Sequence, residues 1–179
     1  MNRITISLGI LAGLILSFAY LLPLAGTDFA NLPADKQVGD GLGYGIMLIS
    51  ASGAVAAMII LWRMNKLLTF GQLVKAGLLT AVITTAVFYI ANIVFYEFIE
   101  PDFLNNYLNH VIQRKAGTIT DEVKKAEYLA NSQKDSGLYT NSYLYAAIMS
   151  ATVFMICLMP VAICGYVLFR LAKRKNLVK

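Results

Sequence analysis

The fold is decided by the stretch Ala76–Tyr96, with the sequence AGLLTAVITTAVFYIANIVFY. It contains no Asp, Glu, Lys, Arg or His. As a helix it is long enough to cross a hydrocarbon layer about 30 Å thick, which needs about 20 apolar residues. Three further stretches of the same kind lie at about 4–24, 42–62 and 144–169. The pattern predicts an all-α membrane protein with four transmembrane helices in a single membrane domain over residues 1–179.

The composition agrees with a chain embedded in a membrane. Hydrophobic residues make up 58% of the 179 positions and charged residues only 14%, whereas about a quarter of a soluble domain is charged. A water-soluble fold of this size has too little interior to bury so many apolar side chains. The composition therefore excludes a disordered chain, a coiled coil and a typical cytosolic enzyme. The first apolar stretch is longer than that of a signal peptide, so we expect it to be retained as a span.

The charged residues are divided between the two ends of the predicted spans. Nine basic residues and no acidic residue lie at the N-terminus, in the connector 63–75 and in the C-terminal tail. All ten acidic residues lie in the connectors 25–41 and 97–143. Because flanks rich in Lys and Arg stay in the cytoplasm, we expect both termini there. The basic tail suits anionic lipid, and no nucleic-acid partner is expected because no nucleic-acid-binding fold is recognisable.

The connector 97–143 is long enough to form structure of its own. Proline cannot continue a helix, so Glu100-Pro101 is expected to end the helical run of the third span. Apolar residues recur at helical spacing from Phe103 to Ile112, with polar residues between them. We predict an extracytoplasmic amphipathic helical hairpin over about 101–136. The sequence leaves three alternatives for the surface against which this hairpin packs: its own bundle, lipid or a partner.

The second helix of this hairpin is expected after Gly117. Thr118 or Thr120 is the predicted N-cap, because hydroxyl oxygens accept hydrogen bonds from the first turn of a helix. Ser136-Gly137 is the predicted stop. A narrow apolar face is expected along Val123, Ala126, Leu129 and Ala130.

Small residues recur at four-residue spacing in three of the four spans. Lipid gives helices no hydrophobic reason to associate, so close helix packing uses small side chains. We therefore expect the four helices to form one bundle, and a homo-oligomer built on one of the stripes stays an alternative. The stripes are Gly9, Gly13 and Ser17; Gly77, Ala81 and Thr85; and Ser50 with Ala54 beside Gly53 with Ala57.

Aromatic residues gather where the predicted spans begin and end. Tyr and Trp prefer the boundary between membrane and water. We therefore interpret these residues as an interfacial belt. They are Tyr44, Trp62, Tyr89, Phe95, Tyr96, Phe98, Tyr139, Tyr143 and Tyr145.

The segment Thr69-Phe70-Gly71-Gln72 precedes the third span and has the spacing of a helix start. Thr69 is the predicted N-cap, and Gln72 lies three residues later, where it closes a capping box. Leu68 and Leu73 occupy the positions of a hydrophobic staple. These residues predict a clean start of the third span.

The chain resembles the domain of unknown function 4199 family. The resemblance is carried by Thr69-Phe70-Gly71-Gln72 with Lys75 and Gly77, then an apolar span, then Pro101-Asp102-Phe103 before the amphipathic insert. It implies a short bacterial protein of the cytoplasmic (inner) membrane with four spans. It implies no activity, substrate or catalytic residue. We interpret both motifs as structural: Thr69, Phe70, Gly71, Gln72, Pro101, Asp102 and Phe103.

Little catalytic chemistry is available in the spans. They hold no ionisable side chain, which speaks against a proton relay or charge-coupled transport. Asn92 is the polar group most costly to expose to lipid, so we expect it inside the bundle, as a contact between helices rather than in a polar path. Glu97, Glu100 and Asp102 have the oxygen ligands that calcium prefers, but we interpret them as a solvated acidic corner. No catalytic, metal-ligand or cofactor-binding motif occurs, so we expect no cofactor and no enzyme activity.

Charge-free spans and an amphipathic insert together favour a role in binding another component of the membrane or envelope. We expect a structural or interaction component of the bacterial envelope, whose partners are the lipid bilayer and either another membrane or envelope protein or further copies of the chain. The alternative is a small channel or transporter for a neutral or hydrophobic solute, lined by Ser, Thr and Asn. An enzyme acting on lipid has the least support, because the sequence offers no catalytic groups for it.

Overall fold

The computed structural model describes residues 2–29, 40–64 and 69–174. The chain is helical in these ranges and has no strand in them, so the all-α prediction is confirmed for the described residues. The elements are α1 (Asn2–Ala25), α2 (Asp40–Met64), α3 (Phe70–Val94), the short π-helix η1 (Phe95–Ile99), α4 (Phe103–Gly117), α5 (Glu122–Tyr139) and α6 (Ser142–Arg174).

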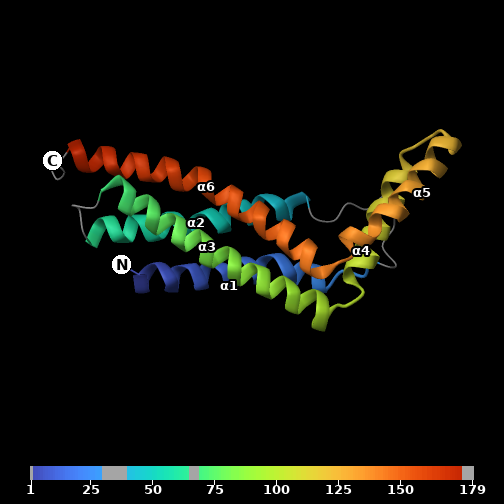
Figure 1. Ribbon diagram of the computed structural model, residues 1–179, viewed down its shortest axis with the longest axis horizontal. Coiled ribbons are helices and arrows are strands. Elements are labelled where there is room, and N and C mark those ends of the chain that lie inside the picture. The colour runs from blue at the N-terminus through green and yellow to red at the C-terminus, as the bar shows by residue number, and fades with distance from the viewer. Residues whose placement is uncertain (1, 30–39, 65–68, 175–179) are drawn as a thin grey trace.

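The helices α1, α2, α3 and α6 form an elongated bundle (Figure 1). Helices α4 and α5, which we call the insert, project beyond one end of this bundle (Figure 1). We call the end next to α4 the insert end. The opposite end, where α1 begins and α6 ends, is the terminal end (Figure 1). Helix α3 contacts each of the other three bundle helices, and α2 contacts α1 and α6. The two insert helices contact each other.

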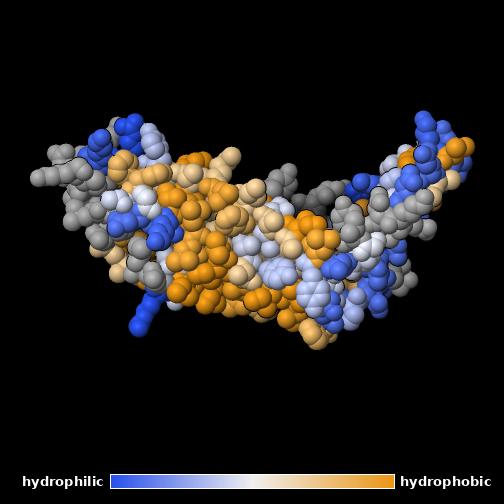
Figure 2. Space-filling view, in the orientation of Figure 1, coloured by the Kyte–Doolittle hydropathy of each residue, from blue (hydrophilic) through white to orange (hydrophobic). Residues whose placement is uncertain are grey.

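Three helical runs are long and apolar enough to cross a membrane: Arg3–Ala25, Phe70–Ile99 and Ser142–Leu171. Helix α2 has 25 residues, and among the described residues Ile49–Met64 is a shorter apolar run within it. Figure 2 shows hydrophobic residues gathered over the middle of the bundle and hydrophilic residues towards both ends. This distribution supports a protein embedded in a membrane, because lipid covers apolar side chains that water would not.

Glycines bring α1 and α3 close together. A Cβ atom on Gly13 would lie 2.6 Å from the Cβ atom of Val87, and one on Gly9 would lie 2.8 Å from the Cβ atom of Ile83. Side-chain carbon atoms do not approach that closely, so these two positions accept only glycine without a shift of the helices.

The other small-residue stripes also lie at helix contacts. Gly53 of α2 faces Ala12 of α1. A Cβ atom on Gly77 of α3 would lie 2.6 Å from the Sδ atom of Met58 on α2 and 2.9 Å from Cγ1 of Val161 on α6. The expectation of one bundle is confirmed, because stripes from different helices face their neighbours within the same chain.

The start of α5 differs from the prediction. Asp121 is the cap, since its Oδ1 atom accepts hydrogen bonds from the backbone N–H groups of Val123 at 3.0 Å and Lys124 at 3.3 Å. The hydroxyl of Thr118 instead donates to a backbone carbonyl at the end of α4. The prediction of Thr118 or Thr120 as N-cap is therefore wrong. An aspartate directly before the helix satisfies two free N–H groups and adds negative charge near the helix start.

The two predicted helix ends in the connector have opposite outcomes. The break at Glu100-Pro101 is confirmed, because η1 ends at Ile99 and α4 begins at Phe103. The stop at Ser136-Gly137 is wrong, because α5 continues to Tyr139. A glycine weakens a helix interior by only about 1 kcal/mol relative to alanine, so it does not by itself end a helix.

Candidate functional site: a tyrosine cluster at the insert end

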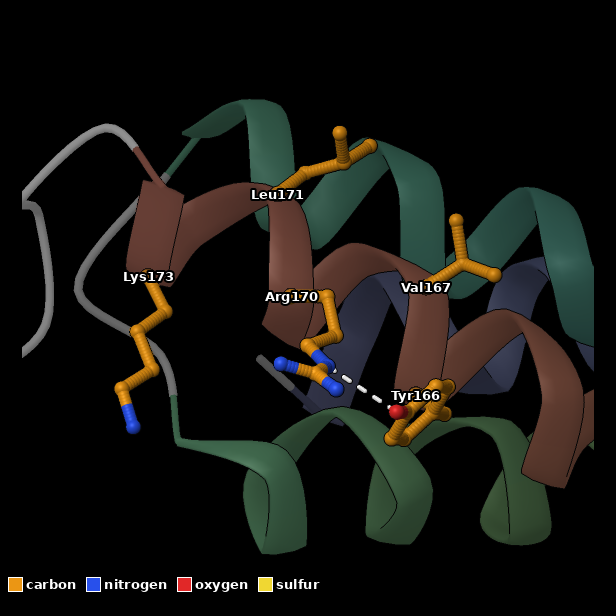
Figure 3. Close-up of a pocket in the computed structure, with 5 residues that line it drawn as sticks. All are labelled: Tyr166, Val167, Arg170, Leu171 and Lys173. Carbon is orange, nitrogen blue, oxygen red and sulfur yellow. Dashed lines mark hydrogen bonds between the residues drawn. The ribbon is translucent and has the colours of Figure 1, made fainter.

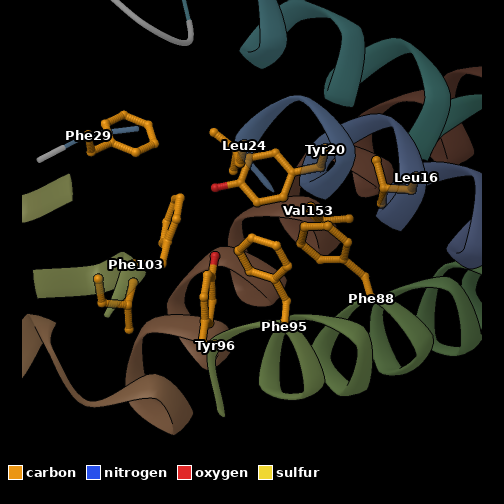
Figure 4. Packing of buried hydrophobic residues seen from close by; sticks show 10 residues of the cluster. Leu16, Tyr20, Leu24, Phe29, Phe88, Phe95, Tyr96, Phe103 and Val153 are labelled. Atoms are coloured by element: carbon orange, nitrogen blue, oxygen red, sulfur yellow. The ribbon is translucent and has the colours of Figure 1, made fainter. Parts of the chain in front are cut away.

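Three tyrosines from three helical elements meet at the insert end: Tyr20 of α1, Tyr96 of η1 and Tyr145 of α6. Tyr20 and Tyr96 are buried, and Tyr145 is partly buried against the same core. The rings of Tyr96 and Tyr145 lie 5.6 Å apart, edge to face, a favourable arrangement for aromatic pairs. Figure 4 shows Tyr20 and Tyr96 approaching each other from their two helices. We call these three residues the tyrosine cluster.

One side-chain hydrogen bond joins the tyrosine cluster to a buried amide. Tyr96 donates its hydroxyl proton to the Oδ1 atom of Asn92 over 3.0 Å. Tyr20 and Tyr145 pack in the same core as Tyr96. Each phenol has one proton to donate, so the Tyr96 hydroxyl is left as an acceptor towards its neighbours. The cluster thus gathers polar groups from three helical elements inside the bundle.

Asn92 is fully buried inside the bundle. Its Nδ2 atom donates to the backbone carbonyl oxygen of Phe88 over 2.7 Å, and its Oδ1 atom accepts from Tyr96. Both bonds stay within one helical run. Asn92 therefore lies inside the bundle as predicted, but these bonds do not make the predicted contact between helices.

The π-helix η1 is what turns two consecutive aromatic residues inward. The N–H group of Glu100 donates to the carbonyl oxygen of Phe95 over 2.8 Å, which is the bond between residues five apart that characterises a π-helix. Phe95 and Tyr96 are consecutive and only 2% and 1% exposed. Single π-turns are often found at functional sites. The hydrophobic spacing of the sequence does not signal this turn.

The interfacial belt is a wrong interpretation for part of the aromatic set. Phe95 and Tyr96 are core residues, and Tyr145 packs against the same core. Phe98 and Tyr143 are exposed, as a belt requires. Residue type alone does not separate the two groups, because a tyrosine suits both a wet interface and a buried site with a hydrogen-bond partner.

Phe103 of α4 fastens the insert to the bundle. Its ring lies 5.3 Å from that of Phe95, 5.5 Å from that of Tyr96 and 5.3 Å from that of Phe29, measured between centroids. On α4 itself it stacks on Tyr107 at 5.8 Å. These rings lie together in Figure 4, where Phe103 stands between Phe29 and Tyr96. The insert is thus held by an aromatic contact that also covers the tyrosine cluster.

The remaining residues of the Pro101-Asp102-Phe103 motif lie at the surface. Pro101 and Asp102 are exposed, and the side chain of Asp102 makes no capping bond to α4. In the described ranges no three His, Cys, Asp or Glu side chains come close enough to hold a metal ion. The structure therefore does not bring Glu97, Glu100 and Asp102 together as a calcium site.

The Thr69-Phe70-Gly71-Gln72 motif lies at the terminal end, far along the bundle from the tyrosine cluster (Figure 1). The predicted capping box is present: Thr69 Oγ1 accepts from the N–H group of Gln72 at 3.3 Å, and Gln72 Oε1 accepts from the N–H group of Thr69 at 2.9 Å. Phe70 packs edge to face on an aromatic ring of α6 at 6.0 Å. A Cβ atom on Gly71 would meet nothing within 4 Å. Leu68 of the predicted staple lies outside the described residues.

The chemistry of the tyrosine cluster is that of neutral hydrogen-bonding groups. Three phenols and one amide pack together from three helical elements, but they supply no nucleophile paired with a base. A pocket of about 270 Å³ adjoins the aromatic contact, with Phe29 and Phe103 in its lining beside Asp28, Glu100 and Asn106. The site is thus suited to holding helices and insert in one arrangement.

One family of known proteins matches the chain. Its description, "Protein of unknown function (DUF4199)", fits residues 7–170. This range includes the capping-box motif, the tyrosine cluster and the insert. Neither the curated proteins nor the solved structures contain a match. Because the matched range covers most of the chain, from α1 to α6, the protein belongs to the DUF4199 family.

Proposed function

We propose that the chain is a four-span protein of the bacterial cytoplasmic membrane, with both termini in the cytoplasm and the insert as a helical hairpin outside it. Three long apolar helices support the membrane location, and α2 runs the same length of the bundle as its neighbours (Figure 1). The basic residues of the terminal end favour the cytoplasmic side for that end. All acidic residues belong to the connectors on the opposite side.

We further propose that the protein is not an enzyme and serves to bind another membrane or envelope protein through α5. The observation that carries this proposal is the exposed apolar side of α5. Val123 is 78% exposed, and Ala126 and Ala130 on the same side are exposed too. This side of the helix does not cover its own bundle, although α4 does so through Phe103. An apolar strip on a projecting helix suits the groove of a protein partner.

The insert is built to present α5 rather than to let it move freely. Helix α4 is anchored in the core through Phe103 and Leu104, and α5 packs on α4. The cap at Asp121 orders the first turn. Because α5 is already held in place by α4, less conformational entropy is lost when α5 binds a partner.

Site-specific photo-crosslinking in native membranes tests this role. A photoreactive residue at Val123 is expected to trap a discrete protein partner, and one at Lys124, on the polar flank of the same turn, to trap much less. The mass of the product separates a second copy of the chain from a different envelope protein. Equal labelling at the two positions, or crosslinks to lipid alone, would contradict the proposal.

A small channel or transporter for a neutral solute is the alternative function. Its lining would come from buried polar groups, but three of these already bond to backbone carbonyls: Thr80, Thr84 and Asn92. Groups bonded in this way favour a structural role over a solute path. Solute flux in reconstituted vesicles that disappears in Asn92→Leu would support the channel and overturn the association role.

A further inference from the structure

We propose that the terminal end of α6 holds the headgroup of an anionic phospholipid in a groove built from Tyr166, Arg170 and Lys173. The groove has a volume of about 530 Å³, and Val167 and Leu171 complete its lining. Figure 3 shows Tyr166, Arg170 and Lys173 leaving the same side of the helix, with Val167 and Leu171 on another side. This site is separate from the association role proposed for α5, at the other end of the molecule.

The guanidinium group of Arg170 is fixed in place without a carboxylate. Its Nε atom donates to the hydroxyl of Tyr166 over 2.9 Å, and its Cζ atom lies 5.4 Å from the centroid of the same ring. A cation within about 6 Å of a tyrosine ring is attracted to the ring face. The bond to Tyr166 uses the Nε donor, so the two terminal nitrogen atoms of the planar guanidinium group can donate to two oxygen atoms of a phosphate.

The described residues of the terminal end include no Asp or Glu. Asp and Glu occur in the sequence only between residues 28 and 135 and are absent from 41–96. On α5, by contrast, Lys124 and Lys125 each have a carboxylate three residues earlier on the chain, at 4.0 Å and 3.7 Å. The charge of Arg170 and Lys173 therefore calls for an anion from outside the chain.

The position of the groove along α6 favours a lipid headgroup over a free anion as its ligand. The apolar run of α6 ends at Leu171, so Arg170 and Lys173 lie where the hydrocarbon layer gives way to headgroups. Val167 and Leu171 leave another side of the same helical turns (Figure 3) and are 47% and 39% exposed, so apolar surface that acyl chains can cover lies at the same level of α6 as the cations. Basic pockets at the cytoplasmic side of membrane helices are typical sites of acidic lipid headgroups.

The test uses the purified full-length chain and measures retained lipid by native mass spectrometry. The probes are phosphatidylglycerol and phosphatidylcholine at equal concentration. We expect preferential retention of phosphatidylglycerol, reduced about tenfold in the double variant Arg170→Gln, Lys173→Gln. Tyr166→Phe keeps the ring but loses the hydroxyl that orients Arg170, and we expect a loss of a few fold. Arg63→Gln removes a positive charge at the end of α2, outside the groove, and is expected to retain phosphatidylglycerol like the wild type.

Three results would overturn the proposal. The first is an equal loss in Arg63→Gln, since this would show attraction to charge in general. The second is displacement of the lipid by inorganic phosphate but not by chloride of equal ionic strength, which would assign the groove to a free anion. The third is unchanged retention in both groove variants. Thermal unfolding of each variant is measured alongside, and if the double variant is unfolded, Tyr166→Phe alone decides.

Discussion

Thr84 of α3 donates its side-chain hydroxyl to the backbone carbonyl oxygen of Gly9 on α1, over 3.2 Å. One turn away, Thr80 makes the same kind of contact to the carbonyl oxygen of Thr5 at 3.5 Å. Both pairs are separated by 75 positions in the sequence, so the two helices run parallel and in register. The glycine at position 9 permits this close approach of α1 and α3, because a side chain there would separate the two backbones.

The first prediction concerns this close approach. Gly13→Ala places a Cβ atom 2.6 Å from Val87 Cβ and 2.9 Å from the carbonyl oxygen of Thr84. We expect the helices to be forced apart at a cost of about 1–3 kcal/mol in the free energy of unfolding. Thermal unfolding in detergent measures it. The matched control is Gly71→Ala, another helical glycine with open space around it, which should not lower the melting temperature.

The second prediction concerns the buried hydrogen bond between Tyr96 and Asn92. Tyr96→Phe removes the hydroxyl that donates to Asn92 Oδ1, which leaves a buried amide oxygen without this donor. The expected loss is about 1–3 kcal/mol in the free energy of unfolding. Tyr143→Phe removes the same hydroxyl from a residue that is 56% exposed and is expected to change little. Equal melting temperatures for the two variants would refute a stabilising role of the bond between Tyr96 and Asn92.

The third prediction concerns the link between bundle and insert. Phe103→Ala removes the ring that contacts both the core and Tyr107. We expect a loss of about 3–5 kcal/mol and faster proteolysis of α4 and α5, because the insert loses its anchor. Phe98→Ala, at a position 78% exposed, serves as the control. If proteolysis of the insert were no faster in Phe103→Ala than in Phe98→Ala, the anchor would lie elsewhere.

The fourth prediction concerns the start of α3. Thr69→Ala removes the acceptor for the N–H group of Gln72 and is expected to lower stability by ~1 kcal/mol. Thr152→Ala is the matched control, because that hydroxyl is exposed and bonds only to the preceding turn of its own helix. A variant at Thr69 that folds with unchanged stability but loses partner binding would show that the motif is functional rather than structural.

The residues of the tyrosine cluster show where prediction from sequence stops. Asn92 lies inside the bundle as predicted, because an amide in an apolar span finds hydrogen-bond partners only in the protein interior. The sequence predicts Tyr96 and Tyr145 at the membrane surface, because a tyrosine near a span end suits both the interface and the interior, and neighbouring residues do not indicate which one it occupies. Their burial depends on Tyr20, which is distant in the chain and packs in the same core.

Local patterns were sufficient where the interaction partners are neighbours in sequence. Apolar length, the capping box of Thr69 and the break at Glu100-Pro101 depend on residues within a few positions of one another, so the sequence alone determined the helices and their membrane character. The cap of α5 is the local exception, since Thr118, Thr120 and Asp121 all carry acceptors and Asp121 is the one that caps the helix. Tertiary structure decided which helices touch, the inward turn of η1 and the exposure of Val123. Each of these features depends on contacts between segments that are distant in the sequence, and local sequence patterns do not predict the geometry of such contacts.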